Sequence, residues 1–133
     1  MDKKNKKILI VDNDKDLCNL ISDIMEEDGY SVKKVYDGNS ALDEILGSKF
    51  DVMIIDNKLS GISGINVIER SKYLNPSIRT IMISAYGNTN TKLRARDLGV
   101  YDFLDKPFDI RMLLSRVGEV LFNPKLAGVS LIL

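Results

Sequence analysis

Short runs of consecutive apolar, mostly β-branched residues constrain the fold of this chain more than any other feature. They lie at residues 8–11, 52–55 and 81–83. An unbroken apolar run fits a strand buried on both faces of a parallel sheet, whereas a strand with one wet face alternates apolar and polar residues. Two mixed segments, 31–36 and 101–104, are expected to be strands that lie nearer an edge or are partly exposed. The sequence therefore predicts five strands.

Segments with helical periodicity lie between these strands. Apolar residues spaced three or four apart predict five helices: residues 14–28, a helix around Ala41 ending at Gly47, a helix around Ile68 ending before Asn75, residues 89–98, and residues 110–121. Strands that alternate with helices through short connections favour right-handed βα crossovers. We therefore expect an open, doubly wound α/β sheet with helices on both faces.

The domain organisation follows from where this pattern begins and ends. The length of 133 residues fits one domain. Residues 1–6 are expected to form a flexible basic tail, residues 7–122 the folded domain, and residues 123–133 a second tail or the start of a linker. Hydrophobic residues make up 44% of the chain, which is enough for an ordinary buried core.

The composition excludes several classes of function. Basic and acidic residues both number 19, so no net charge draws the chain to nucleic acid. With no histidine and the single cysteine Cys18, the chain forms neither an intrachain disulfide nor a Cys/His zinc site, and histidine base catalysis is excluded. No apolar run approaches the roughly 20 residues of a membrane span. We expect a cytoplasmic protein that binds neither nucleic acid nor membrane directly.

Polar residues stand where the predicted strands end. Asp12 and Asn13 follow the first strand, Asp56 and Ser84 follow the next two central strands, and Lys106 follows the last strand. Ligands of open parallel sheets bind at the carboxyl ends of the strands, so these side chains are expected to share one crevice.

This set of side chains has a coherent joint use. Carboxylate and amide oxygens suit Mg2+, which also keeps waters and phosphate oxygens. A hydroxyl and an ammonium group bind phosphoryl oxygens, and a carboxylate such as Asp56 can accept a phosphoryl group. The residues therefore favour phosphoryl chemistry on an aspartate.

Four stretches, in this order and at these spacings, resemble the receiver domain of bacterial two-component response regulators. They are residues 11–14, 56–64, 84–87 and 101–108. The last two are most similar to the receivers of single-domain phosphorelay proteins and of nitrogen-regulation-type activators. The resemblance covers about residues 7–121. It implies a flavodoxin-like (βα)5 fold with the strand order 2-1-3-4-5.

The resemblance also implies a phosphoacceptor and a metal site. Asp56 would accept a phosphoryl group from a sensor histidine kinase or a histidine phosphotransferase. Asp12, Asn13 and Asp56 would hold Mg2+, or Mn2+ in its place, together with the backbone carbonyl of Lys58. The chain would then be a signalling phosphoacceptor and not an enzyme.

Further roles are implied for the phosphoryl-binding and switch residues. Ser84, the backbone of Ala85 and Lys106 would contact the phosphoryl group, and the Lys106–Pro107 peptide would be cis. Ser84 and Phe103 would change conformation on phosphorylation. The partner-binding face would comprise residues 89–98, 101–104 and 110–121, and it would serve a downstream output domain or protein, or a phosphorylation-dependent dimer.

Two positions depart from the family pattern. Asn13 stands where a second aspartate is usual, so we expect weaker Mg2+ binding. Ser60 stands where proline is usual, so we expect a looser loop between Asn57 and Gly64.

Two other functions compete with the receiver. A phosphatase of the haloacid-dehalogenase type would use Asp12 as nucleophile and Asp14 as acid, but it lacks the further acidic pair after the lysine and leaves Asp56 unexplained. Asn13 also leaves open a receiver-like module that binds partners without phosphate. As structural interpretations, Asp14 and Asp16 suit the capping of a helix or the complementing of its dipole, and Cys18 suits packing.

Overall fold

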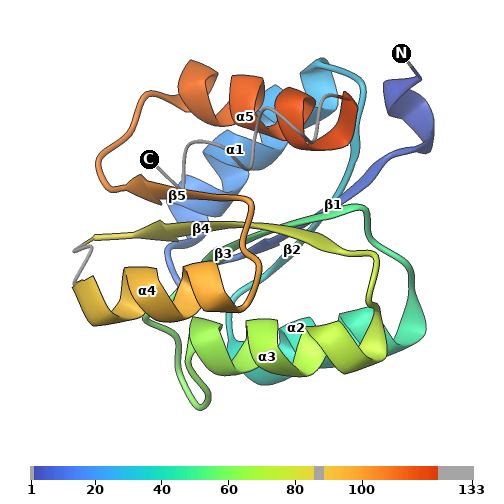
Figure 1. The fold of residues 1–133 in the computed structure, drawn as a ribbon. Coiled ribbons are helices and arrows are strands. Elements are labelled where there is room, and N and C mark those ends of the chain that lie inside the picture. The colour runs from blue at the N-terminus through green and yellow to red at the C-terminus, as the bar shows by residue number, and fades with distance from the viewer. Residues whose placement is uncertain (1, 86–88, 123–133) are drawn as a thin grey trace.

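The computed structural model describes residues 2–85 and 89–122. Five strands alternate with five α-helices (Figure 1). The strands are β1 (Lys7–Val11), β2 (Ser31–Val35), β3 (Val52–Asp56), β4 (Arg79–Ser84) and β5 (Asp102–Asp105). The helices are α1 (Lys15–Glu27), α2 (Gly38–Gly47), α3 (Gly64–Leu74), α4 (Thr89–Asp97) and α5 (Ile110–Phe122).

The five strands form one parallel sheet in the order β2-β1-β3-β4-β5. Helices α1 and α5 cover one face of the sheet, and α2, α3 and α4 cover the other (Figure 1). The predicted doubly wound fold and its strand order are therefore confirmed.

Each face of the sheet packs its own hydrophobic core. Ile8 and Ile54 point toward α1 and α5, whereas Leu9 and Met53 point toward α2, α3 and α4. All four side chains are fully buried because neighbouring residues of a strand point to opposite faces and helices cover both. This two-sided burial explains the unbroken apolar runs of the sequence.

The helix ends follow local chemistry. The Asp14 carboxylate accepts a hydrogen bond from the Leu17 amide and caps α1, while Asp16 lies in the first turn. Gly29 follows this helix with φ of 108°, a conformation that glycine adopts without strain. The interpretation of these two residues is confirmed, with Asp14 as the cap and Asp16 where its charge complements the helix dipole, and the helix ends where the sequence indicated.

The limits of several elements differ from expectation, as β5 and the N-terminal segment show. Strand β5 begins at Asp102, one residue later than predicted, since the ladder with β4 starts at the pair Ile81 and Asp102. The segment expected to be a tail contains a short 3-10 helix, Lys3–Asn5, which the Asp2 side chain caps. The Lys3 ammonium is 2.7 Å from the Asp28 carboxylate, so an ion pair joins this segment to the end of α1.

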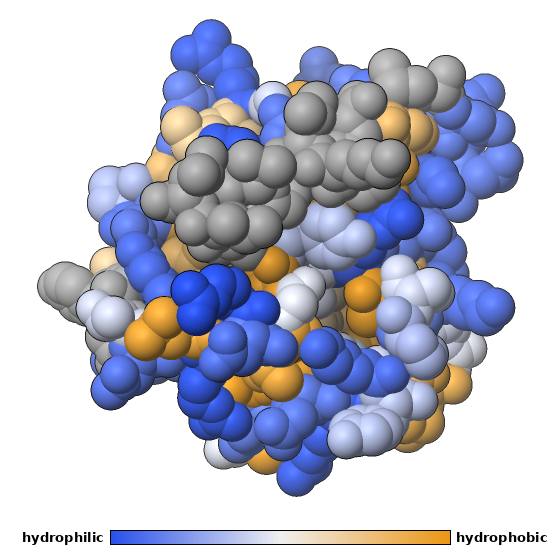
Figure 2. All heavy atoms as spheres, in the orientation of Figure 1, coloured by the Kyte–Doolittle hydropathy of each residue, from blue (hydrophilic) through white to orange (hydrophobic). Residues whose placement is uncertain are grey.

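The proposed limits at residues 6 and 122 stay a prediction, and residues 123–133 lie outside the described residues. Where Figure 2 draws the described residues in colour, hydrophilic side chains predominate, with apolar atoms between them. Within residues 2–85 and 89–122, no helix is long and apolar enough to cross a membrane.

Two glycines give a test of the packing. A Cβ at Gly64 would overlap the backbone carbonyl of Asp56, whereas a Cβ at Gly118, inside α5, would meet open space. We expect Gly64→Ala to lower the free energy of unfolding by about 1–3 kcal/mol. Gly118→Ala should raise it by about 0.5–1 kcal/mol, because alanine restricts the unfolded chain and favours a helix. Urea unfolding followed by circular dichroism measures both, and equal effects would contradict this packing.

Candidate functional site

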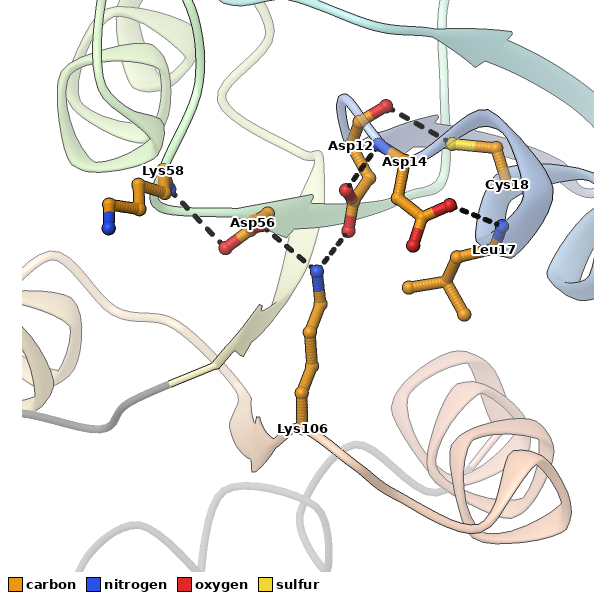
Figure 3. Close-up of polar contacts among 7 residues, drawn as sticks. All are labelled: Asp12, Asp14, Leu17, Cys18, Asp56, Lys58 and Lys106. Atoms are coloured by element: carbon orange, nitrogen blue, oxygen red, sulfur yellow. Dashed lines mark hydrogen bonds and ion pairs between the residues drawn. The ribbon is translucent and has the colours of Figure 1, made fainter.

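Three strands bring the central charged residues together. Val11 of β1 pairs with Ile55 of β3, so Asp12 and Asp56 leave neighbouring strands at the same level. Lys106 follows β5, and its ammonium lies 2.7 Å from Asp12 Oδ2 and 3.0 Å from Asp56 Oδ2 (Figure 3). The Asp12 residue is fully buried and Asp56 is 5% exposed. A single ammonium group therefore serves two buried carboxylates.

Asp12 is held through its backbone as well as its side chain. Its Oδ1 accepts a hydrogen bond from the Asp14 amide at 2.9 Å, and its own amide donates to the Val35 carbonyl at 3.2 Å. The Cys18 thiol donates to the Asp12 carbonyl at 3.3 Å (Figure 3). Both oxygens of this carboxylate are therefore engaged and its orientation is fixed.

Asp56 has contacts on both of its oxygens. Oδ1 accepts a hydrogen bond from the Lys58 amide at 3.3 Å, and Oδ2 faces the Lys106 ammonium. The side chain points from the end of β3 toward Lys106 (Figure 3). Its carboxylate lies at the carboxyl edge of the sheet, where ligands of this architecture bind.

The pKa of Lys106 reflects this environment. Burial lowers the pKa, but hydrogen bonds to Asp12 and Asp56 and the charges of both carboxylates raise it by more, so the net shift is upward from 10.5. The ammonium form therefore stabilises the fold at neutral pH, and this contribution is lost only as the pH rises through the raised pKa. The Lys106 amide also donates to the Ser84 carbonyl at 2.7 Å, and the Lys106–Pro107 peptide is cis.

The donor set suits a hard divalent cation. Asp12 and Asp56 supply carboxylate oxygens, while Asn13 and Lys58 lie on the exposed side of the same edge. Within residues 2–85 and 89–122, no three His, Cys, Asp or Glu side chains gather as a metal cluster. Mg2+ fits such a site because it tolerates one or two protein carboxylates and keeps several waters.

The remaining predicted residues lie on β4 and β5. Ser84 ends β4 and is 7% exposed, and Ala85 beside it is exposed. Phe103 of β5 is half-buried beneath Lys92 of α4, whose ammonium lies 5.1 Å from the ring centroid. Residues 86 and 87 of the motif at 84–87 lie outside the described residues.

An apolar groove borders the charged site. Its volume is about 610 Å³, and Lys106, the one charged residue among the described residues of its lining, and Ala85 line the side nearest the charged site. Its other walls come from the start of α1 and from the segment between β5 and α5, namely Leu17, Leu20, Pro107, Phe108 and Ile110. Leu20 is 51% exposed, so this groove presents apolar surface beside Lys106, whose ammonium contacts Asp56.

Two nearby residues have structural roles. The Asp14 carboxylate caps α1. A phosphatase would use this carboxylate as its acid, but here it is engaged in the hydrogen bond of the cap. Burial, followed by the charges of Asp12 and Asp14, raises the pKa of the Cys18 thiol to about 11. This thiol is therefore a packing group and a weak donor, as expected from the sequence.

One residue at the site was missed by the sequence analysis. Asn57 follows Asp56, its Oδ1 accepts a hydrogen bond from the Ile65 amide at 3.1 Å, and its carbonyl accepts one from the Gly64 amide at 2.9 Å. Asparagine side chains often form hydrogen bonds to the backbone near turns, and this tendency is the only signal in the sequence for the role of Asn57. The partners lie seven and eight residues away, so the contact depends on the folded loop.

The geometry agrees with a comparison against known families. The model of the response regulator receiver domain matches residues 8–118. The chain belongs to this family. As a receiver domain, it is a signalling phosphoacceptor of two-component systems rather than an enzyme, which argues against the phosphatase hypothesis.

Two curated relatives show the range of proteins that contain such a domain. The chain is 32% identical over 117 residues to sporulation initiation phosphotransferase F of Bacillus subtilis, covering 88% of this chain and 94% of the relative. It is 36% identical over 104 residues to the nitrogen assimilation regulatory protein NtrX of Azorhizobium caulinodans. That match covers 77% of this chain but 23% of the longer relative.

Solved structures share the fold. A CheY-like receiver domain protein from Methanospirillum hungatei has a TM-score of 0.87 at 28% identity, covering 92% of this chain and 98% of that one. The response regulator TrrA from Thermotoga maritima, solved in complex with Mg2+-BeF, has a TM-score of 0.78 at 25% identity. The second match covers 87% of this chain and 99% of TrrA.

The shared ammonium group gives a test of the electrostatics. Lys106→Met leaves two buried carboxylates without their counter-ion, so we expect the free energy of unfolding at pH 7 to fall by about 1–3 kcal/mol. The loss should shrink as the pH rises through the raised pKa of Lys106, because the parent chain then loses the ammonium charge as well. Urea unfolding at pH 7 and at higher pH measures this. Exposed Lys49→Met is the control, and an equal loss there would contradict the account.

Proposed function

We propose that Asp56 accepts a phosphoryl group from a phosphohistidine of a sensor histidine kinase or a histidine phosphotransferase. The observation that carries this proposal is the Asp56 carboxylate itself. It lies at the carboxyl edge of the sheet between the Lys58 amide and the Lys106 ammonium. It is the acidic side chain of the site that does not cap a helix and is not fully buried.

The transfer is a displacement at phosphorus. An oxygen of Asp56 forms the new bond to phosphorus while the bond from phosphorus to the donor histidine nitrogen breaks. The Lys106 ammonium offsets the negative charge of the transferred group. The Ser84 hydroxyl and the backbone amide of Ala85 bind the other phosphoryl oxygens. No side chain has to remove a proton, because the attacking group is already a carboxylate.

We propose that Asp12, Asn13, Asp56 and the Lys58 carbonyl hold Mg2+, or Mn2+ in its place. The all-oxygen donor set supports this assignment, as does the Mg2+-BeF complex of TrrA. When bound, the ion offsets charge on the phosphoryl oxygens and orients them. Lys106 would then share the Asp12 and Asp56 carboxylates with this second cation.

The proposed output is a change in the face formed by α4, β5 and α5. Ser84 and Phe103 would respond to the phosphoryl group and alter this face for an output domain, an output protein or a second copy of the chain. The contact of Phe103 with Lys92 joins two elements of this face. The apolar groove of Leu17, Leu20 and Phe108 supports docking of the donor protein beside Asp56.

The proposal applies both to a stand-alone relay protein and to a domain of a longer regulator. The match covers 94% of one relative and 23% of a longer one, so the relatives include proteins of both kinds of length. The proposal includes a cytoplasmic location without direct nucleic-acid or membrane contact. A buried, unpaired thiol and a net charge of zero are consistent with it.

A small phosphodonor tests the function. We expect the chain to gain one phosphoryl group from acetyl phosphate in the presence of Mg2+, and Asp56→Asn to gain none, as measured by intact mass. Asp14→Asn, which changes a helix cap, should still be modified. A chain that gains no phosphoryl group from any donor would favour the phosphate-independent module. Phosphatase turnover that survives Asp56→Asn would favour the rejected alternative.

The departure at Asn13 gives a second test. Asn13→Asp adds a carboxylate beside the proposed metal, so we expect Mg2+ to bind at least about threefold more tightly. Asn5→Asp adds the same charge in the 3-10 helix that precedes β1 and should leave the affinity unchanged. Amide chemical shifts in a MgCl2 titration measure both affinities. Equal affinity of Asn13→Asp and the parent chain would contradict the metal assignment.

A further inference from the structure

Asn57 joins both ends of the loop that follows Asp56. Its carbonyl accepts a hydrogen bond from the Gly64 amide at 2.9 Å, and its side-chain Oδ1 accepts one from the Ile65 amide at 3.1 Å. Gly64 and Ile65 begin α3. One residue therefore closes the connection from β3 to α3 directly beside Asp56.

The loop has little rigidity of its own. Gly61 has φ of 81°, and Ser60 stands where receivers usually have proline. Gly64 lies against the Asp56 carbonyl so closely that a Cβ would overlap it. The close approach must be maintained by contacts, because residues 60, 61 and 64 do not restrict the backbone strongly.

The same loop carries groups of the phosphoryl site. The Lys58 amide donates to Asp56 Oδ1 at 3.3 Å, and the Lys58 carbonyl is the proposed metal ligand. Asn57 lies between Asp56 and Lys58 in the chain, so its backbone orientation sets the direction of both neighbouring peptide groups. A change at Asn57 therefore reaches the site without any contact between its side chain and the phosphoryl group.

We propose that Asn57 is a positioning residue, which holds the Lys58 peptide in the geometry that binds Mg2+ and thereby compensates for the absence of proline at Ser60. The inference rests on the proposed function, since it assigns the Lys58 carbonyl to the metal. It adds a residue outside the ligand set and explains why the loop is closed without the usual proline.

The competing explanation is that Asn57 only caps α3. Ser63 provides the matched control, because its Oγ accepts a hydrogen bond from the Asn66 amide at 3.2 Å in the same first turn. Ser63→Ala removes a cap of α3 and leaves the Asn57 contacts in place. Stability alone therefore does not separate the two explanations, but Mg2+ affinity does.

The experiment compares Asn57→Ala and Ser63→Ala by urea unfolding and by MgCl2 titration monitored by amide chemical shifts. We expect both variants to lose stability and only Asn57→Ala to bind Mg2+ about tenfold more weakly. Hydrogen exchange at the Gly64 and Ile65 amides should accelerate in Asn57→Ala. Adding Ser60→Pro to this variant should restore most of the Mg2+ affinity.

The outcomes that overturn the inference are distinct. Equal Mg2+ affinity of the two variants would reduce Asn57 to a helix cap. If Asn57→Ala does not fold, Ser60→Pro alone decides the question: unchanged Mg2+ affinity supports a loop already held by Asn57, and a large increase contradicts it. A parent chain that binds no Mg2+ would overturn the metal assignment of the proposed function as well.

Discussion

The ammonium of Lys106, shared by two carboxylates, is the interaction on which the site depends. Asp12 and Asp56 leave adjacent strands at one level, and both are withdrawn from water. Two buried negative charges so close together are costly unless a cation lies between them. Lys106, which follows the outermost strand β5, supplies that cation, and its ammonium lies 2.7 Å from Asp12 and 3.0 Å from Asp56. The cluster of Asp12, Asp56 and Lys106 keeps one net negative charge, which favours a further cation. Together with Lys106, such a cation would offset the charge of a phosphoryl group.

Different elements of the fold hold the residues around this cluster. The loop closed by Asn57 presents Lys58 to Asp56, and the cis peptide at Pro107 follows the lysine that links the two aspartates. Between β5 and α4, Phe103 contacts Lys92, whose ammonium is also 3.3 Å from the Asp105 carboxylate. Strand β5 therefore joins the proposed phosphoryl site to the proposed output face, since Lys106 directly follows this strand and Phe103 lies within it.

The sequence predicts much of this arrangement because its strongest signals are local. Unbroken apolar runs at 8–11 and 52–55 require burial on both faces, which only a covered parallel sheet provides. A parallel sheet then brings Asp12 and Asp56 to one edge. The contacts of Asn57 with Gly64, of Lys3 with Asp28 and of Lys92 with Phe103 could not be predicted in this way, because they depend on how loops and helix ends meet in three dimensions. Helix α4 shows the same limit, since Ala95 is its single fully buried residue among those described and its apolar pattern is weak.

The most direct test of the central claim is a titration with beryllofluoride, a mimic of the phosphoryl group, followed by backbone amide chemical shifts. If Asp56 is the phosphoacceptor beside a Mg2+ site, the shifts will require Mg2+, begin at Asp12, Asp56, Lys58 and Lys106, and extend to Phe103. They will be absent in the Asp56→Asn variant. Shifts that persist in that variant, or that appear equally without Mg2+, would contradict the account.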